Sequence, residues 1–220
     1  MLRDGWYRSA KLLARLMMPT FGRVEVEGVE NVPPFGPLII AANHQSNADP
    51  PVLVHAFPRP IWFVAKRGLF VTLPVRYILR RLHARPVARD GRDVDAVKWA
   101  IEQVAQDHAL LIFPEGTRSP GALAPGGDGL AYLALRTQAP IIPVGITGTE
   151  RINNYARVAF PFTRIKVAIG EPFTLPVVEG RLPRAALHSM TEMIMERIAA
   201  LLPQPYRGVY GAERCAPGET

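Results

Sequence analysis

The sequence predicts a single α/β domain, with a mixed, largely parallel sheet covered by helices and preceded by an N-terminal amphipathic helix. Two observations favour this class. Short, continuously apolar runs bounded by turn residues are typical of strands buried on both faces. These runs alternate with helical stretches, as they do where helices connect parallel strands. At 220 residues and 48% hydrophobic composition, the chain is long enough to bury one substantial core.

The first segment, Leu2–Met18, has the pattern of an amphipathic helix. At about 3.6 residues per turn Arg8, Lys11 and Arg15 fall on one stripe, while Trp6, Leu13 and Met17 fall on another, on which Arg3 also lies. Such a helix can lie among lipid headgroups, or it can pack its apolar stripe on the domain. Both interpretations stay open. We assign residues 1–19 to this helix and expect it at a membrane surface.

The domain follows over residues 20–202 as alternating strands and helices. The expected strands are Arg23–Val29, Pro37–Ala42, Ile61–Ala65, Arg85–Ala88, Leu110–Phe113, Pro140–Gly145 and Arg164–Ile169. The expected helices are Asp49–Phe57, Leu73–Leu82, Val94–Asp107, Leu130–Thr137 and Pro183–Leu202. From Pro203 the composition turns polar and rich in Pro and Gly, which predicts a flexible tail over residues 203–220.

The charge balance favours an anionic partner. With 26 Lys+Arg against 19 Asp+Glu, the formal net charge of +7 suits nucleic acid, an acidic lipid surface or a phosphorylated substrate. The sequence has no ribonucleoprotein motif, Cys/His finger or long basic arm, so nucleic acid ranks below lipid. Cys215 is the only cysteine, so no disulfide within the chain is expected. No apolar run approaches the roughly 18 residues that span a bilayer, and we expect a soluble or peripheral chain.

The first candidate site is the polar segment that follows the strand Pro37–Ala42. His44 and Asp49 lie there on a strand-to-helix turn, a common position for active-site groups in α/β folds. A carboxylate that accepts from one imidazole nitrogen leaves the other nitrogen free as a general base. Alternatively, Asp49 before Pro50 is a helix N-cap and His44 a hydrogen-bonded turn residue. The segment alone does not decide between these interpretations.

The second candidate site follows the strand Leu110–Phe113, which runs into the turn Pro114-Glu115-Gly116-Thr117-Arg118-Ser119. Backbone amides near Gly116, with Arg118 beside them, can bind a phosphate through charge-assisted hydrogen bonds. The alternative is a solvated loop charge at Arg118 and a turn acceptor at Glu115.

Together, the two segments resemble the glycerophospholipid acyltransferase family, whose members include the lysophosphatidic acid acyltransferases. The second segment follows the first by about seventy residues, as in the family. Two further blocks agree in order and spacing: Ala84–Arg89 is similar to the family's second motif, and Ile141–Ile146 to its fourth. The resemblance covers roughly residues 24–176, which is most of the chain.

The resemblance implies an O-acyltransferase in which His44 is the general base and Asp49 orients it, while the acceptor's own hydroxyl attacks an acyl thioester. The residues that it places around the acceptor are Arg89, Glu115, Gly116, Thr117 and Arg118, with Arg89 at the phosphate. It places Ile142, Pro143 and Val144 on the acyl-chain or donor side, although these three also suit a plain core strand.

The remaining histidines lack metal-ligand spacing, so we expect no metal and no bound cofactor. The resemblance implies acyl-CoA or acyl-carrier protein as the donor. The acceptor is a lysophospholipid, foremost 1-acylglycerol 3-phosphate, which gives phosphatidic acid. The location is peripheral, on the cytoplasmic face of a membrane with anionic lipids.

Three alternatives stay open. The family often carries a Lys after its third motif, where this chain has Pro125–Gly129, so the acceptor can be a different lyso-lipid or polar alcohol. A thioesterase would use water in place of the alcohol. A non-catalytic basic lipid-binding protein would use Leu2–Met18 alone, but pure binding has no need of the His44/Asp49 pair.

Overall fold

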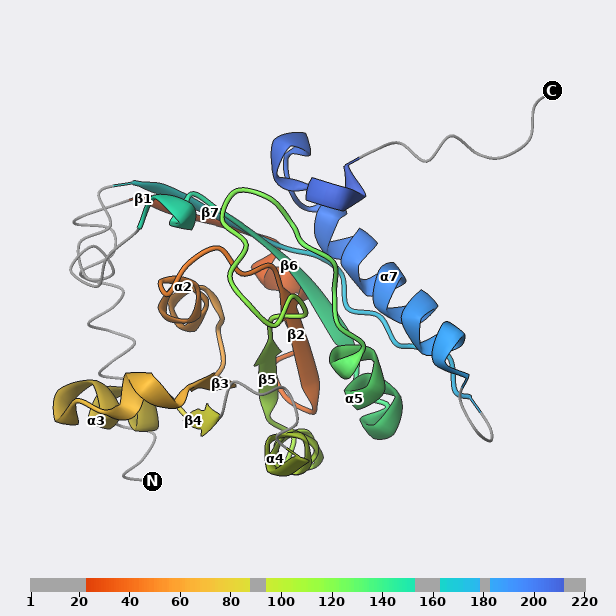
Figure 1. Ribbon diagram of the computed structural model, residues 1–220, viewed down its shortest axis with the longest axis horizontal. Helices are drawn as coiled ribbons and strands as arrows, with labels where there is room; N and C mark the ends of the chain where they lie inside the picture. Colours follow the sequence, from red (N-terminus) through yellow and green to blue (C-terminus); the bar gives the residue numbers. More distant parts are fainter. Residues whose placement is uncertain (1–22, 88–93, 153–162, 179–182, 212–220) are drawn as a thin grey trace.

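The computed structural model describes residues 23–87, 94–152, 163–178 and 183–211 (Figure 1). Its strands are β1 (Arg23–Glu27), β2 (Leu38–Ala42), β3 (Ile61–Lys66), β4 (Ala84–Val87), β5 (Ala109–Ile112), β6 (Ile141–Thr147) and β7 (Arg164–Ile169). Its α-helices are α2 (Asp49–Ala56), α3 (Leu73–Arg81), α4 (Val94–Ala105), α5 (Gly129–Thr137) and α7 (Arg184–Ala200). The expected helix Leu2–Met18 lies outside the described residues.

The strands form one sheet in the order β1-β7-β6-β2-β5-β3-β4. Strands β6, β2, β5, β3 and β4 run parallel to one another, and β7 pairs antiparallel with β6 and parallel with β1. The expectation of a mixed, largely parallel sheet is therefore confirmed. Because β2, β5 and β6 are parallel neighbours at the centre, their carboxyl ends meet at one edge of the sheet.

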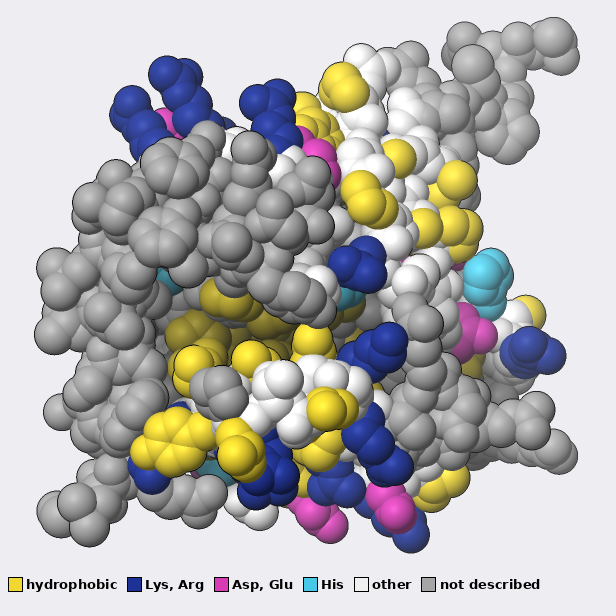
Figure 2. Space-filling model, turned by 60° about the vertical axis from the view of Figure 1, so that its left-hand side comes forward, with side chains coloured by type: hydrophobic (Ala, Val, Ile, Leu, Met, Phe, Trp, Pro, Cys, Tyr) yellow, Lys and Arg dark blue, Asp and Glu magenta, His cyan; other side chains and the backbone are white. Residues whose placement is uncertain are grey.

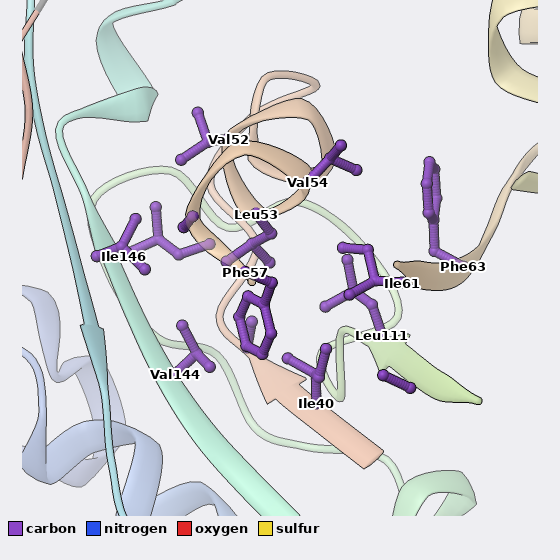
Figure 3. Packing of buried hydrophobic residues seen from close by; sticks show 14 of the residues in the cluster. Ile40, Val52, Leu53, Val54, Phe57, Ile61, Phe63, Leu111, Val144 and Ile146 are labelled. Carbon is purple, nitrogen blue, oxygen red and sulfur yellow. The ribbon is translucent and has the colours of Figure 1, made fainter. Parts of the chain in front are cut away.

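Helices cover both faces of the sheet, as Figure 1 shows, with α2 and α3 on one side and α4, α5 and α7 on the other. Strand β2 is buried throughout and contributes to both cores, with Ile40 in the cluster under α2 and Ile39 in the cluster under α5 and α7. Figure 3 shows Leu53 of α2 and Phe57, which directly follows the helix, on the same side of the sheet as Ile40. Burying each such side chain stabilises the fold by about 1.5–3 kcal/mol, so α2 is held firmly on the centre of the sheet.

Gly148 marks a close approach between two strands at the end of β6. It adopts a positive φ of 88°, and a Cβ atom at this position would overlap the carbonyl oxygen of Arg164 in β7. Only glycine combines that conformation with that contact. Gly148 therefore allows β7 to begin directly beside the end of β6.

Residues 203–211 differ from the expectation of a flexible tail. They form two short 3₁₀ helices, Gln204–Tyr206 and Gly208–Tyr210, after α7. The Tyr206 hydroxyl donates to Glu150 at 2.9 Å and the Tyr210 hydroxyl to Glu192 at 3.0 Å. Burial raises the pKa of Tyr210 to about 12. The two tyrosines anchor the segment on the domain, and composition alone does not indicate this.

Candidate active site

His44 lies in the turn between β2 and α2, at the carboxyl edge of the sheet. The turn begins directly after Ala42, the last residue of β2, and ends where Asp49 and Pro50 open α2. Proline is favoured in the first turn of a helix because it lacks an N–H that would need a partner. The N-cap residue is Ala48, which makes no side-chain capping bond, so Asp49 does not serve as the cap.

The carboxylate of Asp49 is fully buried and turned toward His44. Its Oδ2 lies 2.7 Å from His44 Nδ1 and also accepts the backbone N–H groups of Gln45 at 2.6 Å and Ser46 at 2.8 Å. An ionised carboxylate can only accept hydrogen bonds, so His44 Nδ1 carries the proton in this contact. The other ring nitrogen, Nε2, is then unprotonated in the neutral imidazole and can act as a base.

Glu115 joins the second predicted segment to this turn. Its Oε1 accepts the backbone N–H of His44 at 2.7 Å, and its Oε2 accepts the N–H of Ala124 at 2.9 Å. The Ser119 N–H donates back to the carbonyl oxygen of His44 at 2.7 Å. The main chain of His44 is therefore held on both sides by the turn that follows β5.

Burial raises the pKa of Glu115 above its usual value. Hydrogen bonds from the backbone N–H groups of Ala124 and His44 oppose this rise because they stabilise the ionised carboxylate, but desolvation is the larger effect. Both oxygens of Glu115 are thus occupied by main-chain donors. Glu115 therefore holds the main chain of the site in place rather than offering a free acceptor oxygen to a ligand.

The ring of His44 is supported by Phe113. The two rings stack with their centroids 4.0 Å apart and an angle of 17° between their planes. Asp49 fixes one end of the imidazole and Phe113 covers one face, while the His44 side chain remains 18% exposed. The imidazole is therefore restrained in orientation and still open to a small reactant.

Two buried amides attach the turn to β6. Asn43 forms a reciprocal pair with Ile146: its Nδ2 donates to the Ile146 carbonyl oxygen at 2.9 Å, and its Oδ1 accepts the Ile146 N–H at 2.7 Å. Gln45 Nε2 donates to the same carbonyl oxygen at 3.2 Å, and its Oε1 accepts the Gly121 N–H at 2.9 Å. Buried amides without partners are costly, so these bonds specify one position for the turn.

The structure brings His44, Asp49 and Glu115 together and places the other predicted residues at varying depth. Gly116, Thr117 and Arg118 are exposed on the turn after β5, and Gly116 has a positive φ of 66°. The residues expected on the acyl or donor side, Ile142, Pro143 and Val144, are buried inside β6. They pack as core rather than at an open surface. Arg89 lies outside the described residues.

Sequence reasoning missed the supporting roles of Phe113, Asn43 and Gln45. Each belongs to a quoted motif, but each acts through a partner far away in the chain, with Asn43 and Ile146 separated by 103 residues. The available signal was a run of polar residues directly after an apolar strand, which is unusual unless those residues are hydrogen-bonded.

The described part of the chain contains neither a metal-binding cluster nor a membrane-spanning helix. Within residues 23–87, 94–152, 163–178 and 183–211, no three His, Cys, Asp or Glu side chains cluster in a way that would hold a metal ion. None of the helices described has the length and apolar character needed to cross a bilayer.

Comparison with known proteins shows one consistent family. Residues 23–147, more than half of the chain, match the family model described as Acyltransferase. The chain is 27% identical over 196 residues to the 1-acyl-sn-glycerol-3-phosphate acyltransferase of Bacillus subtilis (strain 168), covering 89% of this chain and 96% of that protein. It is 33% identical over 147 residues to the chloroplastic 1-acyl-sn-glycerol-3-phosphate acyltransferase BAT2 of Brassica napus, covering 65% of this chain and 42% of the relative. The chain therefore spans less than half of the plant protein.

The fold agrees with a solved structure. The crystal structure of the 1-acyl-sn-glycerophosphate (LPA) acyltransferase PlsC from Thermotoga maritima superposes with a TM-score of 0.71 at 29% sequence identity. The match covers 89% of this chain and 78% of that chain.

Proposed function

Since this chain belongs to the acyltransferase family, we propose that it moves a fatty acyl group from an acyl thioester to the free hydroxyl of 1-acylglycerol 3-phosphate. The product is phosphatidic acid. The observation that carries the proposal is the His44–Asp49 pair, with Nδ1 bound at 2.7 Å and Nε2 left open beside an exposed turn. The names of the Bacillus and Brassica relatives support this acceptor.

The transfer needs a base and a means of holding two substrates. His44 Nε2 takes the proton of the acceptor hydroxyl, whose oxygen attacks the carbonyl carbon of the thioester and forms a tetrahedral intermediate. The C–S bond then breaks, and the leaving thiolate takes the proton back from the imidazolium. Asp49 stabilises that imidazolium while it exists. A positioned base of this kind contributes about 10²- to 10⁴-fold in rate.

The acceptor phosphate is bound by the cationic side of the site. We assign it to Arg118, which is exposed on the turn after β5, and to Arg89 in the second motif. Arg suits this role because its planar guanidinium can donate two parallel bonds to a phosphate. Gly116 and Thr117 complete this turn beside the acceptor, and Glu115 keeps the turn attached to His44.

The proposal also covers the acyl donor and the location of the enzyme at a membrane. Acyl-CoA and acyl-carrier protein both present a thioester, and either serves as donor; no cofactor is bound. The acceptor and product are lipids, so we place the enzyme peripherally on the cytoplasmic face of a membrane, with Leu2–Met18 lying among anionic headgroups. Removing residues 1–19 would then weaken binding to anionic vesicles at low salt.

The experiment is a labelled acyl-transfer assay in detergent, with acyl-CoA and acyl-carrier protein offered separately. The acceptors are 1-acylglycerol 3-phosphate, other lysophospholipids and a polar alcohol. Labelled phosphatidic acid is the expected product. Transfer to another acceptor alone would fit the absence of a Lys in Pro125–Gly129 and would overturn the proposed acceptor. Release of free fatty acid alone would indicate a thioesterase.

A further inference from the structure

One stretch of the chain is strongly cationic and carries no acidic residue. Between Asp49 and Asp90 there is no Asp or Glu. The stretch contains eight basic residues: Arg59, Lys66, Arg67, Arg76, Arg80, Arg81, Arg85 and Arg89. Positive charge is therefore concentrated in one part of the sequence, well beyond what the net charge of +7 over the whole chain would suggest.

Within this stretch, the described residues from Ile61 to Val87 form one side of the domain, from β3 through the 3₁₀ helix η2 (Arg67–Phe70) and α3 to the edge strand β4. Among the side chains described there, none in α3 is buried. Large apolar side chains are instead exposed along η2 and α3: Val71 at 78%, Leu73 at 68%, Val75 at 40%, Tyr77 at 47% and Ile78 at 47%. We call these five side chains, together with the exposed cations Lys66, Arg67 and Arg80, the α3 surface.

Helix α3 turns Leu79 toward the core, and its opposite side carries Leu73 and Tyr77 together with Arg76 and Arg80, at spacings of three, four and seven residues. Exposed apolar side chains flanked by Arg are typical of helices that lie in a membrane interface. Long basic side chains can also extend from such a position to headgroup phosphates.

The α3 surface begins at the edge of the sheet that carries the site. Strand β3 runs parallel to β5, and β5 to β2, so Lys66 at the carboxyl end of β3 lies on the same edge as the turn that bears His44. Figure 2 shows hydrophobic side chains with Lys and Arg beside them along the lower part of this face, below a hollow with a hydrophobic floor. A lipid layer in contact with this surface would lie near the site.

We propose that η2 and α3 dock on an anionic lipid bilayer, with Val71 and Leu73 entering the interface and Lys66, Arg67 and Arg80 binding headgroup phosphates. Lipid suits this surface better than nucleic acid because four of its five exposed apolar side chains, all except Tyr77, are aliphatic and cannot stack on bases. The docking does not depend on the transfer reaction, since bilayers without substrate suffice to measure it.

The test is sedimentation of the full chain with vesicles of phosphatidylcholine, with and without phosphatidylglycerol, at low and high salt. The test variant is the triple Lys66→Glu, Arg67→Glu, Arg80→Glu, three exposed cations of the α3 surface. The matched control is Lys98→Glu, Arg136→Glu, Arg184→Glu, three exposed cations on α4, α5 and α7 across the sheet. Both variants change the net charge equally.

We expect the test triple to need at least tenfold more anionic lipid for half-binding, and the control to stay within about threefold of wild type. High salt should remove most of the difference. A second pair separates apolar insertion from charge: Val71→Ser with Leu73→Ser should weaken binding at both salt levels, and Phe35→Ser with Val177→Ser, which are equally exposed, should not.

The proposal is overturned if both triples weaken binding equally, if neither does, or if wild type does not bind anionic vesicles. Transfer activity in detergent, measured on the same triples, should remain near wild type. A loss there would concern the proposed function and not the docking surface.

Discussion

The backbone N–H of His44 donates to Glu115 Oε1 at 2.7 Å, which joins two turns that lie 71 residues apart in the chain. One turn carries His44, the proposed base, and the other carries the exposed Gly116-Thr117-Arg118 segment. Because Glu115 binds the main chain of His44 itself, the two halves of the site cannot shift independently. The Glu115 carboxylate holds the two turns together, and its desolvation on burial raises its pKa.

This raised pKa predicts how stability depends on pH. The folded state binds the Glu115 proton more tightly than the unfolded state, so its contribution to stability is fully present below the usual glutamate pKa of 4.5 and is lost as pH rises through the folded value. The free energy of unfolding of wild type, taken relative to Glu115→Gln, should therefore fall as pH rises across that window. Urea unfolding at several pH values measures the difference, and a relative gain for wild type with rising pH would contradict the assignment.

Asp49→Asn should reduce kcat by about 10²- to 10⁴-fold. A neutral amide oxygen accepts the three N–H groups that now meet at Oδ2 more weakly than a carboxylate does, and it no longer stabilises the imidazolium. Asp95→Asn, on the exposed surface of α4, is the matched control and should keep wild-type kcat. Steady-state kinetics with circular dichroism on both variants test this, and equal kcat values for the two would refute the orienting role.

Asn43→Ala should destabilise the fold, because it leaves the buried N–H of Ile146 without its side-chain acceptor and removes one of the two amide donors to the Ile146 carbonyl oxygen. A buried group left unpaired costs about 1–3 kcal/mol. Ser189→Ala removes a hydroxyl that donates to the Ala185 carbonyl on an exposed part of α7, and should change stability by less than about 0.5 kcal/mol. Urea unfolding of the two variants gives the comparison; similar midpoints would mean that the Asn43–Ile146 pair contributes nothing net.

The sequence predicts the elements well because each is a local pattern. All seven strands and the five α-helices in the described residues occur within three residues of the expected ends. The order of the strands depends on pairing between distant segments, and no local pattern reveals that β7 reverses direction beside β6. The same distinction between local patterns and long-range contacts applies to the site. His44 and Asp49 are five residues apart and were found as a pair, whereas the Phe113 stack and the Asn43–Ile146 bonds depend on the sheet.

The residues assigned to the acyl or donor side by resemblance alone lie in the core for a physical reason. Ile142 and Val144 alternate with Pro143 along β6, and the strand is covered on both faces, so their side chains are enclosed by α2 and the sheet. A motif records which residues recur together, but it does not say whether they touch a substrate or hold the strand that does.

Gly148→Ala should cost far more stability than Gly36→Ala. Both glycines have a positive φ, 88° and 84°, so both substitutions carry the same backbone strain of about 1–3 kcal/mol. At Gly36 a Cβ meets nothing, whereas at Gly148 it meets the Arg164 carbonyl oxygen. Thermal unfolding should therefore show a lower Tm for Gly148→Ala than for Gly36→Ala. Matching Tm values would mean that β6 and β7 can separate at this point without cost.

The central claim is that His44 is the base of an acyl transfer, and His44→Ala tests it most directly. His188→Ala, an exposed histidine on α7, serves as the control. With 1-acylglycerol 3-phosphate and a labelled acyl thioester, we expect His44→Ala to lose at least 10²-fold in kcat while its circular dichroism spectrum and Tm stay close to those of wild type, and His188→Ala to keep full activity. A folded His44→Ala protein that retained most of its transfer activity would contradict the account.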